Sequence, residues 1–114
     1  MATFNPAKKK VRVSVLASAT TLLTQANALD EVYCLNFCNT TNSDINLAVY
    51  ELDADGSTKH YLIGGGTIAL CPTVPANGIL EWTGSCILDA ASETVKAIAS
   101  ATGVDCNGGY LEYT

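Results

Sequence analysis

Positive charge is scarce in this sequence. Among its 114 residues only six are Lys or Arg, against eleven Asp or Glu, and the net charge is −5. A surface that binds nucleic acid needs Lys and Arg spread over it to displace counterions from phosphates. Four of the six cations lie together, at Lys8–Lys10 and Arg12. Lysines at a strand edge more often keep that edge soluble, so nucleic-acid binding is not expected.

Long apolar runs are also missing. No stretch reaches the roughly 18 apolar residues that a membrane-spanning helix needs, so no such helix is expected. Residues 8–28 imitate a secretion signal, with lysines, an apolar stretch at Val13–Leu23 and small residues at Ala26–Ala28. Four Ser and Thr residues interrupt the apolar stretch. We therefore expect this segment to remain in the folded chain.

Histidine occurs once, at His60. It alone titrates near neutral pH, yet nothing close in sequence completes a set of nucleophile, base and orienting group. Motifs of serine hydrolases, zinc proteases and kinases are absent. Gly64–Gly66 lacks the Lys-Ser/Thr pair and the helix of a phosphate-binding loop, and precedes a strand-like segment. The sequence therefore predicts neither enzymatic activity nor a cofactor.

Two patterns could bind a metal ion, and both are incomplete. Asp53 and Asp55 begin like a calcium loop around Gly56, but Leu62 stands where that loop needs a glutamate. Zinc sites use close pairs of Cys or His on either side of a spacer, and here only Cys34 and Cys38 form such a pair. No metal site is predicted.

The five cysteines are an odd number, so at least one thiol stays free or pairs between chains. Most are expected to be small buried apolar side chains. One disulfide is possible, and the sequence does not identify its partners, which would come from Cys34, Cys38, Cys71, Cys86 and Cys106.

Charged residues make up only 15% of the chain, against about 25% in ordinary soluble domains. Two interpretations remain open. A partner covers part of the surface, or the surface is polar but uncharged, rich in Thr, Ser and Asn. A chain of this length buries roughly 65% of its unfolded surface, enough for a single domain without metal or disulfide support.

Apolar residues alternate with polar ones in the manner of β-strands. Val11, Val13 and Val15 share one face of a strand. Residues 31–38 are apolar at nearly every position, which predicts an inner strand covered on both faces. A polar turn at 39–44 leads to a strand at 45–50, and this pair is predicted to form a hairpin.

Short strands are predicted through the rest of the chain. Thr20–Leu29 fits a strand better than a helix, residues 88–93 form a helical turn or a tight connection, and Trp82 fills the core. About eight strands at near ten-residue spacing predict an all-β fold, a small antiparallel sandwich or barrel. We expect an N-terminal arm over 1–10 and one β-sandwich domain over 11–114. The remaining strands are predicted at 60–63, 67–71, 79–83, 94–100 and, as an edge strand, 110–114.

The order of these elements resembles the small β-sandwich structural proteins of tailed bacteriophages. The resemblance covers roughly residues 30–112 and consists of turn and core patterns. The chain departs from the family at Leu88–Ser92, where the usual Gly-Asp turn is missing. The matching segments are Cys38–Asp44, Val49–Gly56, Ile68–Leu80 (with Pro75-Ala76-Asn77-Gly78), Ile87–Asp89, Val95–Ser100 and the final Glu112.

This resemblance implies a virion component that is assembled in the host cytoplasm and has no catalytic residues. The leading hypothesis is a capsid decoration (cement) protein that binds the major capsid protein or another virion protein and itself forms a homo-oligomer. Alternatives are a neck or tail accessory protein, or a carbohydrate-binding or host-surface-binding module using Tyr61, Tyr110 and Tyr113. The expected protein interface is the basic N-terminal segment, with Phe4, Lys8, Lys9, Lys10 and Arg12.

Overall fold

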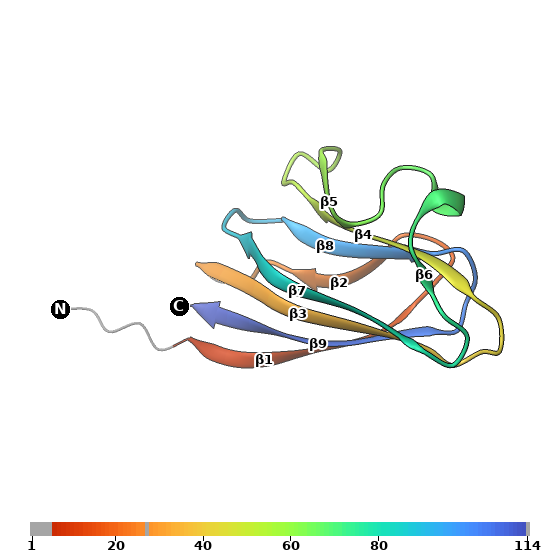
Figure 1. Ribbon diagram of the computed structural model, residues 1–114. Coiled ribbons are helices and arrows are strands. Elements are labelled where there is room, and N and C mark those ends of the chain that lie inside the picture. Colours follow the sequence, from red (N-terminus) through yellow and green to blue (C-terminus); the bar gives the residue numbers. More distant parts are fainter. Residues whose placement is uncertain (1–5, 27, 114) are drawn as a thin grey trace.

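The computed structural model describes residues 6–26 and 28–113. Two antiparallel sheets face each other and enclose one apolar layer, as Figure 1 shows. The first sheet has the strand order β1 (Ala7–Val15), β9 (Val104–Tyr113), β3 (Leu29–Asn39), β7 (Ile79–Leu88). The second has the order β2 (Thr20–Thr24), β8 (Thr94–Ala99), β4 (Ile45–Leu52), β5 (Lys59–Ile63), and the short β6 (Thr73–Val74) pairs with β4.

The predicted β-sandwich is confirmed, and its strand order is that of a jelly roll. All neighbours of β9 (β1 and β3) and of β8 (β2 and β4) come from distant parts of the chain, because the chain crosses repeatedly between the sheets. The alternation that predicted the strands also orients them. Along β8, for example, Val95, Ala97 and Ala99 point inward and are buried, while Lys96 and Ile98 point outward.

The apolar layer is built around Phe37, the largest side chain that is fully buried. Leu35 lies two residues before it on β3, and Leu47 and Val49 face it from the second sheet as parts of the same cluster. Trp82, predicted to fill the core, is instead half-buried and packs against the margin of this cluster. The reason is its position on β7, which is an edge strand and leaves one side of the indole uncovered.

The predicted hairpin between residues 31–38 and 45–50 is wrong. These segments are β3 and β4, and they belong to different sheets. The polar turn carries the chain from one sheet to the other, and Asn39 fixes this crossing. Its buried amide donates to the carbonyls of Ser43 (2.7 Å) and Val74 (3.0 Å), and its oxygen accepts from the Thr41 amide (2.9 Å).

Two further local predictions are wrong. The segment 67–71 forms a 3₁₀ turn, Ile68–Leu70, because Gly64 turns the chain with a positive φ of 77° and the Cys71 thiol bonds to the carbonyl of Thr67 (3.3 Å). The C-terminal strand is not an edge. It is the inner strand β9, because β1 pairs along its free side over nine residues. In the part of the chain that the structure describes, no helix has the length and apolar character to cross a membrane.

Strand β1 already includes part of the segment expected to be an arm. Ala7 pairs with Glu112 and Lys10 with Gly109, so the lysines belong to the first sheet. The first residues of β1 and the last residues of β9 lie at the same end of the sandwich (Figure 1). This end also holds the last residues of β4 and the first of β8, which form the acidic cluster described below.

The Asn39 bridge yields a test of the fold. We expect Asn39→Ala to lower the free energy of unfolding by about 2 kcal/mol, because it leaves the buried Val74 carbonyl without its donor. Asn42→Ala in the same turn is the control, since that side chain is exposed and should cost much less. Denaturant unfolding measures both, and equal losses would contradict the assigned role of Asn39.

Candidate interaction surface

The first sheet presents an outer face whose side chains line up in rows across the strands. Strand register places Arg12, Asn107, Asn36 and Glu81 in one such row. Inward positions on these strands, such as Val11 and Phe37, are buried, so the alternate positions point outward. The outer face is defined by Lys8, Lys10, Arg12 and Ser14 on β1, Asp105, Asn107, Gly109 and Leu111 on β9, Glu31, Cys34, Asn36 and Cys38 on β3, and Ile79, Glu81, Thr83 and Ile87 on β7.

Charge on the outer face changes sign from one edge to the other. Edge strand β1 carries Lys8, Lys10 and Arg12, all exposed. On the opposite side, Glu81 is exposed on β7, and Glu31 on β3 accepts hydrogen bonds from the Ser85 hydroxyl (2.6 Å) and the Tyr113 hydroxyl (3.3 Å). The two edges of the sheet are therefore electrostatically complementary.

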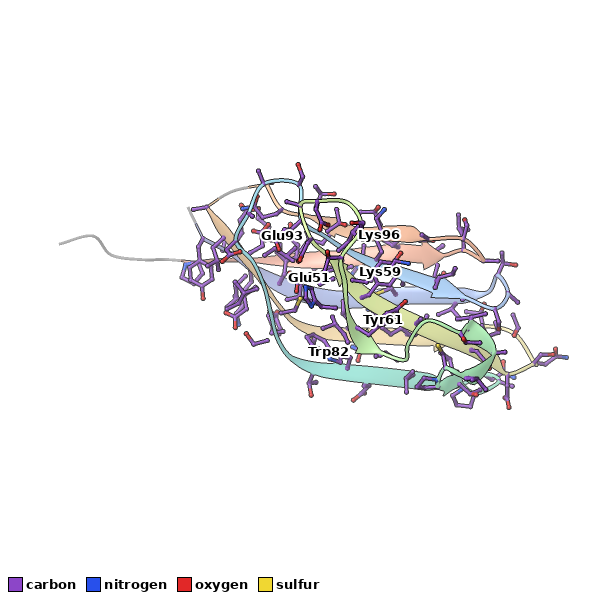
Figure 2. All side chains as sticks on the ribbon, turned by 90° about the horizontal axis from the view of Figure 1, so that it is seen from above. Glu51, Lys59, Tyr61, Trp82, Glu93 and Lys96 are labelled. Carbon is purple, nitrogen blue, oxygen red and sulfur yellow. The ribbon has the colours of Figure 1, made fainter. Side chains whose placement is uncertain are left out.

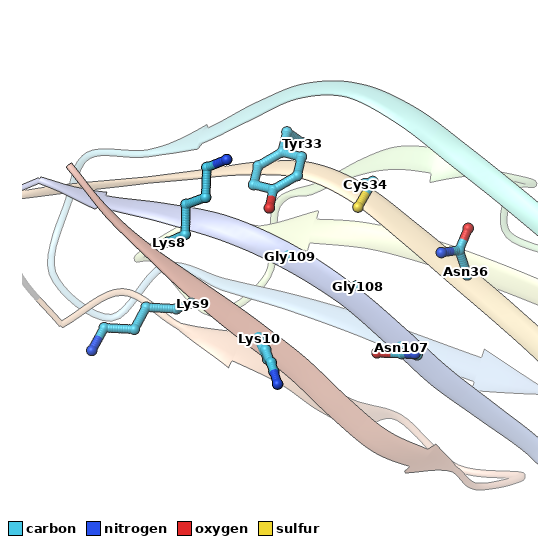
Figure 3. A pocket seen from close by; sticks show the side chains of 9 residues that line it. All are labelled: Lys8, Lys9, Lys10, Tyr33, Cys34, Asn36, Asn107, Gly108 and Gly109. Atoms are coloured by element: carbon cyan, nitrogen blue, oxygen red, sulfur yellow. The ribbon is translucent and has the colours of Figure 1, made fainter.

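A shallow hollow of about 360 Å³ lies on the outer face over β9 (Figure 3). Gly109 forms its floor beneath Tyr33, whose hydroxyl oxygen would be 2.5 Å from a Cβ added to that glycine. At Gly108 an added Cβ would lie 2.3 Å from the Cys34 carbonyl oxygen, so no side chain fits there either. Figure 3 shows Lys8 reaching across β9 toward Tyr33. The hollow thus combines a cationic rim with amide and phenol groups.

The outer face of β3 is less covered than the sequence indicated. Its apolar character predicted cover on both faces, but Tyr33, Cys34 and Cys38 are only half-buried. In residues 6–26 and 28–113 the facing layer lies on the inner side of this sheet alone. Apolar residues also reach the β7 edge, where Ile79 is 57% and Ile87 is 47% exposed. These positions are apolar and, in the described part of the chain, have no second layer over them.

All five cysteines are free thiols in this structure. Cys71, Cys86 and Cys106 are buried, as expected for small apolar side chains. Burial raises the pKa of both Cys86 and Cys106 to about 12, so these thiols stay protonated and unreactive at neutral pH. Cys34 and Cys38, on the outer face, are the two thiols that solvent reaches.

A second group of polar side chains lies between the sheets at the end nearest the termini. Carboxylate oxygens of Glu51, Asp53 and Glu93 lie within 4.8 Å of one another, and Figure 2 shows Glu51 and Glu93 at that end. Glu93 is buried and its carboxylate accepts from the amides of Asp89 (2.9 Å) and Ala90 (2.7 Å), which fixes the turn before β8.

Protonation of this acidic cluster is uneven. Burial, followed by the hydrogen bond to Glu93 and its charge, raises the pKa of Glu51. For Glu93 burial acts in the same direction, but the Ala90 amide and the hydrogen bond from Glu51 outweigh it and lower its pKa. Of the two hydrogen-bonded carboxyl groups, Glu51 therefore keeps its proton to a higher pH than Glu93 does. Cys86 of the opposite sheet adds a thiol donor, 3.7 Å from Glu51.

Sequence reasoning missed this cluster, although one signal for it existed. Glu51 continues the alternation of Ile45, Leu47 and Val49 and therefore occupies an inward position on β4. Such an inward carboxyl needs a partner or a raised pKa. Nothing in the sequence identified Glu93 as that partner, because β8 is more than forty residues further along the chain.

The remaining titratable and aromatic candidates are dispersed. His60 is paired with Asp53 (3.1 Å), whose hydrogen bond and charge raise the pKa of the imidazole. Among the described residues it has no hydrogen bond to a hydroxyl or thiol that could act as a nucleophile. Tyr61 lies on the second sheet against Tyr50, with ring centroids 5.4 Å apart, whereas Tyr110 and Tyr113 lie on β9 of the first sheet. The three tyrosines proposed as a sugar platform are therefore not brought together.

The acidic turn after β4 is closed by its own backbone. Asp55 accepts hydrogen bonds from the amides of Ser57 (2.8 Å) and Thr58 (2.9 Å) and from the Thr58 hydroxyl. The Thr58 hydroxyl and these amides lower the pKa of Asp55 to about 2. Its oxygens are thus committed to the turn, which explains the resemblance to a calcium loop without a metal.

The structure brings most of the predicted interface residues together. Lys8, Lys9, Lys10 and Arg12 are exposed along one strand, at the edge of the outer face. Phe4 lies outside the described residues. The sequence did not identify the β7 side of the face, because its importance depends on which strands are left at the edges.

Known proteins resemble this chain in fold but not in sequence. No protein-family model matches the sequence, and no curated protein matches it. Among solved structures, the chain is similar to a subunit structure described by the words "Bacillus endospore appendages form a novel family of disulfide-linked pili". The TM-score is 0.54 and the identity 15%, and the match covers 98% of this chain and 88% of that one.

Two structures of infectious bursal disease virus are similar as well. One, of the T13 viral particle, has a TM-score of 0.53 and 9% identity over 95% of this chain, and one of the Gx strain has 0.51 and 9% over 96%. This chain spans about a third of each viral chain (31% and 32%). At such identities the likeness establishes the fold alone, a sandwich also found in subunits of a pilus and of a viral particle.

The acidic cluster predicts how stability depends on pH. Folding raises the pKa of Glu51. The contribution of this carboxyl to stability is therefore fully present below its unfolded-state pKa near 4.5, and it is lost as the pH rises through its folded-state pKa. We expect Glu51→Gln, which keeps a donor to Glu93 without the charge, to match the parent chain at pH 4 and to exceed it in unfolding free energy at pH 7.

Denaturant unfolding at several pH values measures this difference. Glu81→Gln is the matched control, because it makes the same chemical change at an exposed strand position. Parallel pH profiles for the parent chain and Glu51→Gln would show that folding does not raise the pKa of Glu51.

Proposed function

We propose that this chain is a non-enzymatic structural subunit of a virion, and more specifically a capsid decoration protein that binds neighbouring subunits of an assembled shell. The observation that carries the proposal is the outer face, where exposed apolar side chains lie between charged borders with no second layer over them in the described part of the chain. Exposed apolar side chains rimmed by charge are a common feature of protein-association surfaces. Exposure of this face also accounts for the low fraction of charged residues.

The proposed interface includes Phe4 and the exposed cations Lys8, Lys9, Lys10 and Arg12. All four cations lie on edge strand β1, with Lys8, Lys10 and Arg12 on the outer face and Lys9 on the opposite side. An acidic surface of the major capsid protein or of another virion protein would complement them. An N-terminal arm over 1–10 that reaches a neighbouring subunit is part of the same proposal.

A subunit of an extracellular appendage is the second candidate. The match to the Bacillus pilus structure favours it, because that match covers nearly all of both chains. The thiols that solvent reaches, Cys34 and Cys38, would then be the positions available for links between copies. A carbohydrate-binding module is not favoured, because its three tyrosines lie apart on two sheets.

Location in an assembled particle tests the function directly. With an antibody against this chain, we expect immunogold labels at regular positions on negatively stained virions from the producing cells. Labels along filaments would instead support the second candidate, a subunit of an extracellular appendage. Labels on neither, with the chain found free in solution, would overturn the structural role.

The N-terminal contribution can be tested on the same particles. We expect a chain lacking residues 1–6 to keep the pairing of β1 with β9, and hence its unfolding midpoint, while binding stripped particles more weakly. A triple variant, Lys8→Glu with Lys9→Glu and Lys10→Glu, should reduce occupancy by about tenfold or more if the partner surface is acidic. Unchanged occupancy for both variants would remove residues 1–10 from the interface.

A further inference from the structure

Within residues 6–26 and 28–113, the first sheet has two unpaired edges. β1 pairs with β9 on one side and has no partner on the other. β7, a strand of ten residues, likewise pairs with β3 on one side alone. An exposed edge of this length presents a row of free backbone amides and carbonyls that another strand can join. Short edge strands or charge usually prevent this, and β1 is protected by its lysines. β7 has one charged side chain, Glu81, and two exposed isoleucines.

Strand direction allows the two edges to pair with each other. All three pairings in the order β1-β9-β3-β7 are antiparallel, so β7 runs opposite to β1. When a second copy is placed beside the first in the same orientation, its β1 lies against β7 and is again antiparallel to it. The ladder of hydrogen bonds can therefore continue from copy to copy without a change of strand direction.

Side chains at the two edges fit one particular register. With Arg12 of one copy opposite Glu81 of the other, Val11 lies opposite Trp82 and Val13 opposite Leu80, all four on the inward side. In a single chain Val13, Leu80 and Trp82 are half-buried residues that pack against the core, each at an edge of the sheet. This register would complete their burial.

Charge selects this pairing over pairing between identical edges. Two β1 edges would bring their lysines and arginines together, which like-charge repulsion disfavours. In the β1-to-β7 register the exposed Arg12 meets the exposed Glu81. On the same outward side Lys10 meets Thr83 and Ser14 meets Ile79, so no like charges face each other.

We propose that a second copy of this chain docks its β1 edge along the β7 edge, with Arg12 beside Glu81, so that the first sheet continues from one copy into the next. The contact is head-to-tail, because different edges meet, and it therefore builds rings or filaments rather than closed dimers. This inference deepens the proposed structural function and rests on it only for its biological setting.

Charge reversal at the two central positions tests the contact. We expect the mass of the parent chain, measured by light scattering, to rise with concentration. Arg12→Glu and Glu81→Lys should each raise the protein concentration needed for assembly by about tenfold or more. The double variant should recover assembly. An equimolar mixture of the two single variants should also recover it, since each then meets an opposite charge.

The control changes the charge by the same amount away from both edges. A chain with Ala101→Lys and Thr102→Lys gains two positive charges in the exposed loop before β9, as Glu81→Lys does on β7, and should assemble like the parent chain. Matching thermal unfolding of all variants excludes loss of fold as the cause. Weakened assembly for Glu81→Lys but not for Arg12→Glu would exclude Arg12 from the contact and overturn the proposal.

Cross-linking tests the register itself. Directly opposed residues of antiparallel strands have Cα atoms about 4.5–5.5 Å apart, which is within the range that a disulfide spans. In chains with Cys34→Ser and Cys38→Ser, a mixture of Arg12→Cys and Glu81→Cys should form a disulfide-linked heterodimer under mild oxidation. Either chain alone should not, and absence of the heterodimer from assembled material would overturn the register.

The results separate this contact from the proposed function. A parent chain that stays monomeric at every concentration, yet is found by immunogold on virions, overturns the edge contact and leaves the structural role intact. Assembly with the expected charge dependence, but without any label on particles or filaments, keeps the contact and removes the virion role.

Discussion

The antiparallel pairing of β1 with β9 is the contact on which the arrangement of charge in this molecule depends. It joins residues near the two ends of the chain through nine consecutive residue pairs, from Ala7 with Glu112 to Val15 with Val104. Because of it β9 becomes an inner strand, and most of the positive charge of the chain comes to lie on one edge of one sheet. The opposite edge is then β7, with exposed isoleucines and a glutamate.

Alternation of side chains allowed the strands to be predicted, because a buried face leaves a period of two in the sequence. Which strands pair with each other, however, is not visible as a pattern in the sequence. Nearly all pairings of a jelly roll join distant segments, so the local rule that adjacent strands form hairpins failed for β3 and β4. The 3₁₀ turn at Ile68–Leu70 was missed for a similar reason, since it depends on the thiol of Cys71 and the turn at Gly64.

The candidate surface was foreseen in part. The clustered cations were visible in the sequence, and the apolar outward positions of β3 signalled that something covers them. Two features could not be read from it. Glu81 becomes important only because β7 is an edge, and Glu51 needs Glu93 from the turn before β8, far along the chain. Both depend on topology, whereas the charge and alternation of a segment are local properties.

Opposite edges with opposite charge have a consequence for how copies assemble. A face-to-face dimer would bury the outer faces of both copies, whereas an edge contact leaves that face open in every copy. Since adjacent strands are rotated by roughly 20–25° in a twisted sheet, each added copy turns relative to the last. The outer faces would then follow a helical or circular path, and each would remain available to a shell or to a further layer of subunits. Self-assembly through the edges and binding through the face can therefore coexist on one sandwich of 114 residues.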